Sequence, residues 1–365
     1  MLHIKKITEE EKLTLENMRK NHPGYMPRMR AHAVLLSQDG YQVNDLSDLF
    51  GVCKKTIVAW LRGWANAGIF GLIDKPRKNF YGKSQDVLTI SRKQEIKKIQ
   101  TGLMNGEFEL YYQPKVNMRT GTVSGFEALI RWNDPLRGLL QPSDFLPIIN
   151  NHSVHSEVSS YVMDRALSDL NEWQGQGLDT VVSVNVDELQ LNEHDFLDKL
   201  KASIANYPSF KAGSLELEIL EMNALLDREQ VRTIVDNCQV LGVDFALDDF
   251  GTGNSSLTYL KQIPVKTLNI DRSFISDIDK ESVDLAILEG MVSLASILKR
   301  SVIAKGVETV EQGDVLLKIG CELAQGYAIA KPMPITHIFN FINDWKPFES
   351  WLNAPSMHLT HSFSA

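Results

Sequence analysis

The sequence predicts an α/β fold, in which a (β/α)8 barrel follows a small all-α domain. Two features of the 365-residue chain lead to this prediction. From about residue 107, short β-rich runs alternate with amphipathic stretches, which is typical of parallel strands with helices outside. Residues 7–80 contain only short helical patterns. The length also fits about two domains, because a domain holds roughly 150 residues.

The first two helices are expected from their end signals. Thr8 precedes a run of glutamates, and Glu11 stands where it completes a capping box, so a helix should begin there. Residues 26–38 carry the next helical pattern, and Asp39-Gly40 should end it.

Residues 43–64 have the pattern of a helix-turn-helix, with Gly51 permitting the tight turn. Apolar residues at helical spacing should bury one face of each helix: Leu46, Leu49, Phe50, Ile57, Trp60 and Leu61. The N-terminal part of a recognition helix contacts base edges and phosphates. The outward residues expected to do this are Lys54, Lys55, Thr56 and Arg62.

The charge of the chain is divided unevenly. Residues 1–83 carry 14 Lys and Arg against 8 Asp and Glu, whereas the remainder carries 24 against 38. A basic segment attached to an acidic body favours an anionic partner. Residues 27–78 resemble the helix-turn-helix heads of transposases and bacterial regulators, which implies DNA binding. The alternative is a small helical module for dimerisation or docking.

The strands of the barrel are expected where short β-rich runs occur: 108–116, 123–132, 181–186, 215–220, 245–248, 267–270 and 301–304. Helices are expected between them at 158–173, 195–204, 228–241 and 283–298. A further helix at 91–104 should lead into the barrel. The expected domain bounds are 1–80 for the head, 81–104 for a linker helix, 105–350 for the barrel and 351–365 for a flexible tail.

Polar residues recur at the ends of these runs, at Glu127, Asn185, Glu218, Asp248 and Asp249. In a barrel of this kind, the C-terminal ends of the strands meet on one face. Carboxylate and amide oxygens brought together there form a hard site suited to Mg²⁺ or Mn²⁺. The alternative for any one of these residues is a solvated acid in a loop.

Several short motifs occur in a fixed order in this part of the chain. They are Tyr112–Lys115, Glu127–Leu129, Asn185, Glu218–Glu221, Asp248–Gly253, Ile270–Phe274, Gly306–Thr309 and Gln325–Tyr327. This ordered set resembles EAL domains, the phosphodiesterases that hydrolyse cyclic di-GMP to linear pGpG, and Glu127-Ala128-Leu129 is the motif that names them. The likeness covers about residues 105–345.

The resemblance implies roles for individual residues. It implies a first metal held by Glu127, Asn185, Glu218 and Asp248, and a second held by Asp248 and Asp249. It implies catalytic roles for Glu127, Asp248, Asp249 and Glu308. It implies ligand contacts at Gln113, Arg131, Asn269, Asp271, Lys305 and Gln325. Glu221 is implied to support the 248–256 loop, which helps to form a dimer in this family.

Two positions depart from the family pattern. Asn269 stands where the family has a catalytic Lys, and Lys305 stands where it has a Glu that binds metal. An ammonium about 5 Å from a divalent ion is repelled by roughly 6 kcal/mol at an effective dielectric near 20. We therefore expect one Mg²⁺ or Mn²⁺ site and a weak or absent second one. Lys305 is expected at the position of the second metal, paired with a nucleotide phosphate.

These expectations combine into a regulator related to cyclic di-GMP. A DNA-binding head would be joined to a degenerate EAL barrel that binds cyclic di-GMP or a partner protein, with little or no hydrolysis, in a homodimer. The alternatives are an active Mg- or Mn-dependent phosphodiesterase yielding pGpG, and a pure protein-interaction module. Scattered cysteines, and no apolar run of about 20 residues, predict a cytoplasmic protein without a membrane segment.

Overall fold

The computed structural model describes residues 7–21, 25–50, 52–67, 72, 84–150, 152–220, 228–252, 257–276, 278 and 283–354. The chain separates into two compact units, Met1–Ser91 and Arg92–Ala365. Each unit buries its own apolar cluster. No helix within these described ranges is long and apolar enough to cross a membrane.

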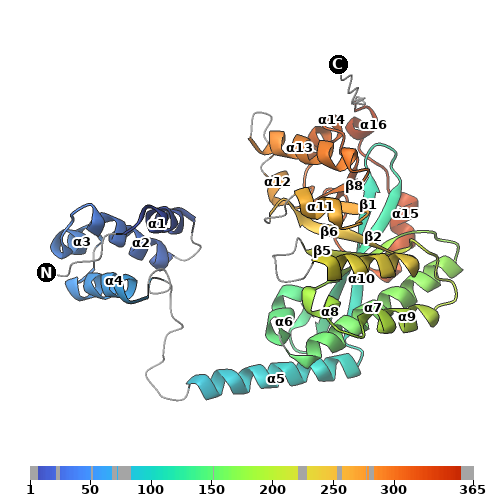
Figure 1. Ribbon diagram of the computed structural model, residues 1–365. Coiled ribbons are helices and arrows are strands. Elements are labelled where there is room, and N and C mark those ends of the chain that lie inside the picture. Colours follow the sequence, from blue (N-terminus) through green and yellow to red (C-terminus); the bar gives the residue numbers. More distant parts are fainter. Residues whose placement is uncertain are drawn as a thin grey trace. The chain divides into compact units, whose positions relative to one another are not determined.

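The first unit is all-α (Figure 1). Its helices are α1 (Glu9–Asn21), α2 (Tyr25–Gln38), α3 (Val43–Phe50) and α4 (Lys54–Ala67). The expected capping box starts α1, since Thr8 Oγ1 accepts from the Glu11 amide at 3.2 Å and Glu11 Oε2 accepts from the Thr8 amide at 2.7 Å. Gly40, at φ 98°, follows α2 in the left-handed conformation that ends helices.

The helix-turn-helix is formed by α3 and α4. Ser47 is buried between the helices, and its hydroxyl donates to the Val52 carbonyl at 2.6 Å, which fixes the turn. One expected core residue is wrong, because Leu49 is 59% exposed. Leu49 is two residues from Ser47 and so lies about 200° around the helix from that buried side. Gly51 lies outside the described residues.

The second unit confirms the predicted barrel. Its strands are β1 (Phe108–Asn117), β2 (Val123–Asp134), β4 (Val182–Val186), β5 (Leu215–Leu220), β6 (Val243–Phe250), β7 (Thr267–Ile270), β8 (Ser301–Lys305) and β9 (Leu323–Gln325). They pair in the order β1-β9-β8-β7-β6-β5-β4-β2, and a β1–β2 pairing closes the ring. Two short strands pair with members of this ring: β3 (Gly138–Leu140) pairs with β2, and β10 (Met333–Pro334) pairs with β1.

One strand runs against the expected direction. β1 is antiparallel to both of its barrel neighbours, β2 and β9. Only residues 118–122 join β1 to β2, and a parallel crossover needs a dozen residues or more. The three-residue strand β9 was not predicted, since so short a run carries no recognisable alternation.

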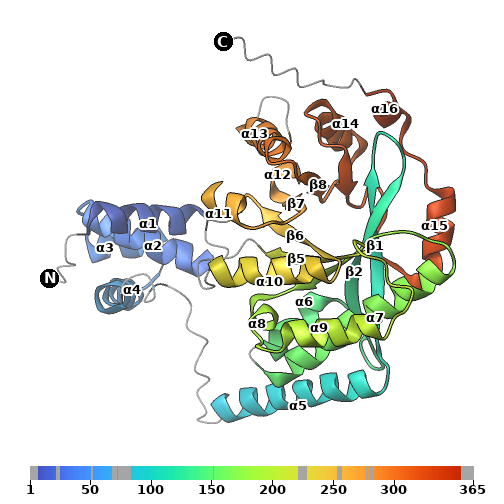
Figure 2. The same ribbon diagram turned by 45° about the vertical axis from the view of Figure 1, so that its right-hand side comes forward.

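Helices cover the outside of the strands, as α10 and α13 show in both views (Figures 1 and 2). The helices are α5 (Ser84–Met104), α6 (Pro142–Ile149), α7 (Ser153–Gly175), α8 (Glu188–Leu191), α9 (Phe196–Ala205), α10 (Arg228–Val240), α11 (Leu257–Gln262), α12 (Ser273–Ser276), α13 (Val283–Ile297), α14 (Val310–Lys318), α15 (Ile338–Asp344) and α16 (Glu349–Leu352). A 3-10 turn, η2 (Ile335–His337), precedes α15.

The expected flexible tail does not begin at residue 351. Trp351 is fully buried, and its indole Nε1 donates to the Val310 carbonyl at 3.0 Å. Its ring packs on Gly313, where an added Cβ would lie 2.4 Å from the indole. Aromatic burial therefore ties this part of the chain to α14, and residues 355–365 lie outside the described part.

Candidate functional site

Three of the five polar residues predicted at the strand ends, Glu127, Asp248 and Asp249, line one hollow of about 470 Å³, here termed the strand-end pocket. Asn185 and Glu218 are not among its described lining residues. Of the predicted site residues, those that line it are Gln113, Glu127, Asp248, Asp249, Asp271, Lys305, Glu308 and Gln325. They come from β1, β2, β6, β8, β9 and the segments that follow β7 and β8. The barrel therefore brings residues from across some 200 positions of sequence to one place.

The centre of the pocket is an ammonium group. Lys305, the last residue of β8, places its Nζ 2.6 Å from Glu218 Oε2 and 2.7 Å from Asp248 Oδ1. Glu127 Oε2 lies 3.7 Å from the same nitrogen. The lysine side chain is only 14% exposed, so these ion pairs form in a largely desolvated environment. Three carboxylates thus surround one fixed positive charge.

This placement differs from the expected one. Glu127, Glu218 and Asp248 are the residues that the resemblance assigned to the first metal, whereas Lys305 was expected at the second. The long lysine stem lets the ammonium reach from β8 across the barrel mouth to β2, β5 and β6. The ammonium therefore takes the centre of the first ligand set.

Burial and charge shift the pKa values of these groups. Burial lowers the pKa of Lys305, but the charges of Glu127, Glu218 and Asp248 outweigh it and hold the pKa well above the ordinary lysine value. Burial, together with the charges of Glu218 and Glu127, raises the pKa of Asp248 to about 6, although Lys305 opposes the rise. The ammonium stays charged at neutral pH, so it behaves as a permanent cation.

Glu218 is held between two lysines. Its Oε1 accepts from Lys115 Nζ at 2.5 Å on one side, and its Oε2 meets Lys305 on the other. Burial raises the pKa of Glu218, but the charges of Lys115 and Lys305 lower it to about 2. Lys115, on β1, is 3% exposed and was not predicted as a site residue. The available signal was its place in the Tyr112–Lys115 motif.

A second polar layer lies beneath this one, inside the barrel. Ser183 Oγ donates to Glu216 Oε1 at 2.8 Å, and Thr267 Oγ1 donates to Glu216 Oε2 at 2.6 Å. Lys115 joins this layer through Glu216 at 3.3 Å. All of these groups are buried, and each finds a partner, as buried polar groups require.

Amide side chains hold the Glu127 carboxylate from the other side. Asn185 Nδ2 donates to Glu127 Oε1 at 2.7 Å, and Gln325 Nε2 donates to Glu127 Oε2 at 2.6 Å. Gln325 also donates to Gln113 Oε1 at 3.1 Å, and Gln113 donates to the Ala330 carbonyl at 3.0 Å. These contacts fix Glu127 toward the centre of the pocket.

Asn269, the residue in place of the family's lysine, is fully buried on β7. Neither its side-chain oxygen nor its side-chain nitrogen has a hydrogen-bond partner among the described residues. A buried amide with both polar atoms unpaired costs folding free energy, so the stability of the fold does not explain an Asn at this position.

Asp249 and Asp271 form an acidic pair at the edge of the pocket. Burial, together with the charge of Asp271, raises the pKa of Asp249. Asp249 has φ 52°, a left-handed conformation that non-glycine residues seldom adopt. Asp271 Oδ1 accepts from the Ser273 amide at 3.0 Å, which orients it.

The remaining predicted residues fall differently. Glu308 lines the pocket and is exposed. Arg131 is 8% exposed and is not among the described lining residues; its guanidinium donates to the Ile130 carbonyl at 2.9 Å and lies over the Tyr111 ring. Glu221 lies outside the described residues. Arg272 and Tyr327 line the pocket but were not singled out from the sequence.

The donor set as positioned does not fit a divalent cation. Its three carboxylates point at the Lys305 ammonium, and the amide nitrogen of Asn185 faces Glu127. Nowhere in the described ranges do three or more Asp, Glu, His or Cys side chains gather as a metal site. A metal would have to displace the ammonium first, at the cost of its ion pairs.

The expected DNA-contacting residues lie on α4. Lys54, Lys55 and Arg62 are exposed, and Thr56 is partly buried. The Thr56 hydroxyl lies 3.2 Å from the sulfur of exposed Cys53, just before the helix. The three basic groups are therefore free to meet phosphates.

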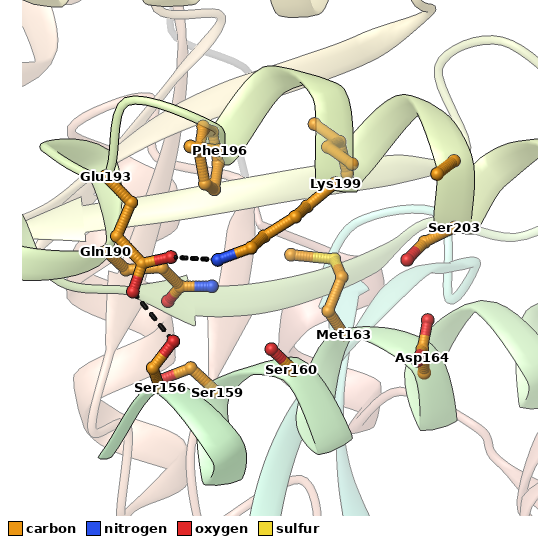
Figure 3. Close-up of a pocket in the computed structure, with 12 residues that line it drawn as sticks. Ser156, Ser159, Ser160, Met163, Asp164, Gln190, Glu193, Phe196, Lys199 and Ser203 are labelled. Carbon is orange, nitrogen blue, oxygen red and sulfur yellow. Dashed lines mark hydrogen bonds and ion pairs between the residues drawn. The ribbon is translucent and has the colours of Figure 1, made fainter. Parts of the chain in front are cut away.

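A smaller hollow of about 300 Å³ lies between α7, α8 and α9 (Figure 3). Its polar groups pair with one another: Ser156 Oγ donates to Glu193 Oε1 at 2.7 Å, and Lys199 Nζ lies 2.7 Å from Glu193 Oε2. The described lining of this hollow includes no predicted site residue, whereas eight predicted site residues line the strand-end pocket, which is therefore the stronger candidate site.

Comparison with known families matches both units. The family model described as EAL domain matches residues 96–332, and the model described as Homeodomain-like domain matches residues 27–73. The first match spans more than half of the chain and includes every described residue of the strand-end pocket.

Two relatives from Pseudomonas aeruginosa are similar to this chain. "Bifunctional diguanylate cyclase/cyclic di-GMP phosphodiesterase MucR" is 33% identical over 273 residues, which is 74% of this chain and 40% of that protein. "Cyclic di-GMP phosphodiesterase NbdA" is 31% identical over 268 residues, covering 73% and 34% respectively. The chain thus spans well under half the length of these relatives.

Solved structures are similar as well. The structure titled "PaMucR Phosphodiesterase, c-di-GMP complex" is 34% identical, with a TM-score of 0.64, covering 67% of this chain and 99% of that one. The EAL domain of Mycobacterium smegmatis DcpA is 30% identical, with a TM-score of 0.55, covering 66% and 98%.

Proposed function

The chain belongs to the EAL domain family, and from this premise we propose that its barrel is a receptor for cyclic di-GMP that hydrolyses the dinucleotide slowly or not at all. One observation carries the proposal. The Lys305 ammonium lies among Glu127, Glu218 and Asp248, where the family's metal ligands are expected.

An ammonium can balance the charge of these carboxylates without supplying the chemistry of a metal. A divalent ion generates a nucleophile by lowering the pKa of a bound water, and it polarises the phosphoryl oxygen. A lysine ammonium has no open coordination position for water. The residue at 269 is also an uncharged Asn, so the cation expected to stabilise the developing charge is missing.

The position of the pocket at the strand ends, and the ligand bound by a similar protein, both support binding of a dinucleotide. The MucR structure at 34% identity is titled as a complex with c-di-GMP, which supports the same ligand class here. The charge of the three central carboxylates is partly offset by Lys305, which weakens the repulsion that an anionic ligand would meet.

The head is proposed to bind DNA. Its match to the Homeodomain-like model and the exposed basic side chains on α4 support this proposal. We propose that the protein acts in the cytoplasm as a homodimer, because two heads can then contact two half-sites. The ligand state of the barrel would regulate DNA binding and so transcription.

The test combines binding and product analysis on one sample. The protein is titrated calorimetrically with cyclic di-GMP in the presence of EDTA, then incubated with cyclic di-GMP and Mn²⁺, and pGpG is measured. Binding with little or no pGpG supports the receptor. Turnover like that of an active EAL enzyme supports the phosphodiesterase alternative. Neither binding nor turnover supports a protein-interaction module.

The DNA-binding part has its own test. The protein is mixed with a pool of duplexes from bacterial promoters, and retained DNA is sequenced. Recovery of an enriched motif with two half-sites supports a dimeric regulator. Recovery of unenriched DNA only, or of none, contradicts it.

A further inference from the structure

We propose that Arg272 is the residue that binds a phosphate of the ligand in the strand-end pocket. This inference rests on the proposed cyclic di-GMP receptor function and names the contact that gives it affinity. Arg272 follows Asp271 in the turn between β7 and α12, lines the pocket and is exposed.

The two lysines in the polar centre of the barrel are already engaged. Lys305 is held by Glu127, Glu218 and Asp248, and Lys115 is 3% exposed beneath them. Moving either ammonium onto a phosphate would leave buried carboxylates unpaired, which is costly. Of the two described cations that line the pocket, Arg272 is the one without an ion pair.

The backbone holds Arg272 at the pocket wall and leaves its side chain free. Its carbonyl accepts from the amides of Ile275 and Ser276 at 2.9 and 2.8 Å, which fixes the turn. Gly306, at φ 81°, passes so close that an added Cβ would lie 2.4 Å from the Arg272 Cβ. The guanidinium therefore starts from a fixed point and is free to meet a ligand.

The charge distribution of the pocket favours the same contact. Its floor contains Glu127 and Asp248, so a phosphodiester is repelled there and should lie toward the rim. Tyr327, 58% exposed, lines that rim, and Lys331 Nζ lies 5.5 Å from its ring centroid. An aromatic ring and an unpaired guanidinium that line the same pocket suit a nucleotide, because the ring can stack on its base and the guanidinium can pair with its phosphate.

The experiment measures cyclic di-GMP affinity by calorimetry in EDTA for the full chain and three variants. Arg272→Ala removes the phosphate contact, and we expect binding to weaken about 10- to 100-fold. Arg272→Lys keeps the charge but loses the bidentate geometry, so its affinity should lie between the two. Lys318→Ala, an exposed cation at the end of α14, removes the same charge elsewhere and should bind like the wild type.

The outcomes separate this inference from the function on which it rests. Wild-type binding that Arg272→Ala weakens and Lys318→Ala leaves unchanged supports both. Equal affinity in the wild type and Arg272→Ala overturns the role of Arg272 and leaves the receptor in place. Failure of the wild type to bind 100 µM ligand overturns the receptor and the inference together.

Discussion

Replacing Lys305 with Met should destabilise the barrel and open it to a metal ion. The substitution keeps the length of the side chain and removes a charge that lies 2.6 Å from Glu218 and 2.7 Å from Asp248. At an effective dielectric of 20, each contact is worth about 6 kcal/mol before desolvation is counted. Desolvation offsets much of this, and the net loss from breaking such a buried pair is about 3–5 kcal/mol.

The assay is thermal unfolding with and without Mn²⁺. A loss of 3–5 kcal/mol should lower the Tm by roughly 6–20 °C in a unit of this size. Mn²⁺ at about 100 times its Kd should then raise the free energy of unfolding of the variant by about 2.7 kcal/mol, because the ion binds the freed carboxylates. Wild-type protein should gain little from Mn²⁺, since its own ammonium fills the position.

A matched control separates burial from pairing. Lys266 lies 2.7 Å from Asp244 Oδ2, but its side chain is 58% exposed. Lys266→Met breaks a pair of the same length, and solvent screening should limit the loss to about 0–1 kcal/mol. The reasoning is refuted if both variants lose equal stability, or if Mn²⁺ stabilises the wild type as much as the Lys305 variant.

Three further outcomes follow from the same structure. The double variant Asn269→Lys with Lys305→Glu should form pGpG from cyclic di-GMP in Mn²⁺ at least about 100 times faster than the wild type, measured by chromatography; equal rates would contradict the assigned roles. Iodoacetamide at pH 8 should label Cys53, which is exposed and whose pKa is lowered by its hydrogen bond to Thr56. It should spare the other two cysteines, because burial raises their thiol pKa values to about 12. Mass spectrometry of the native protein checks this, and early labelling at all three sites would count against the fold. Lys55→Ala should weaken binding to a random-sequence duplex and reduce the salt slope by about 1, whereas Lys20→Ala, on α1, should not; identical slopes would remove α4 from the DNA interface.

The strand-end residues were predictable because strands of a barrel end on one face. Glu127, Glu218 and Asp248 follow from spacing alone, once the alternation of strands and helices is recognised. The departure at Lys305 was visible too, because a lysine stands there in place of the glutamate of the family that the sequence resembles. The spacing could not predict which carboxylates form ion pairs with the Lys305 ammonium, because these pairs depend on how far a flexible side chain reaches across the barrel.

The other differences come from features of side-chain size, loop length and ion pairing. Leu49 was expected in the core because of its spacing, but the small Ser47 turned the other side of α3 inward. The antiparallel β1 followed from a turn too short for a crossover. Arg272 was not predicted as a site residue, because its candidacy depends on its lack of an ion pair among the described residues while Lys305 is paired with three carboxylates. Only the folded structure shows these ion pairs.

Diffraction from crystals grown with both cyclic di-GMP and Mn²⁺, collected at the manganese absorption edge, tests the central claim most directly. The account predicts an intact cyclic dinucleotide, with Lys305 Nζ still between Glu218 and Asp248 and no manganese peak there. A strong anomalous peak coordinated by those carboxylates, beside a linearised product, would contradict it.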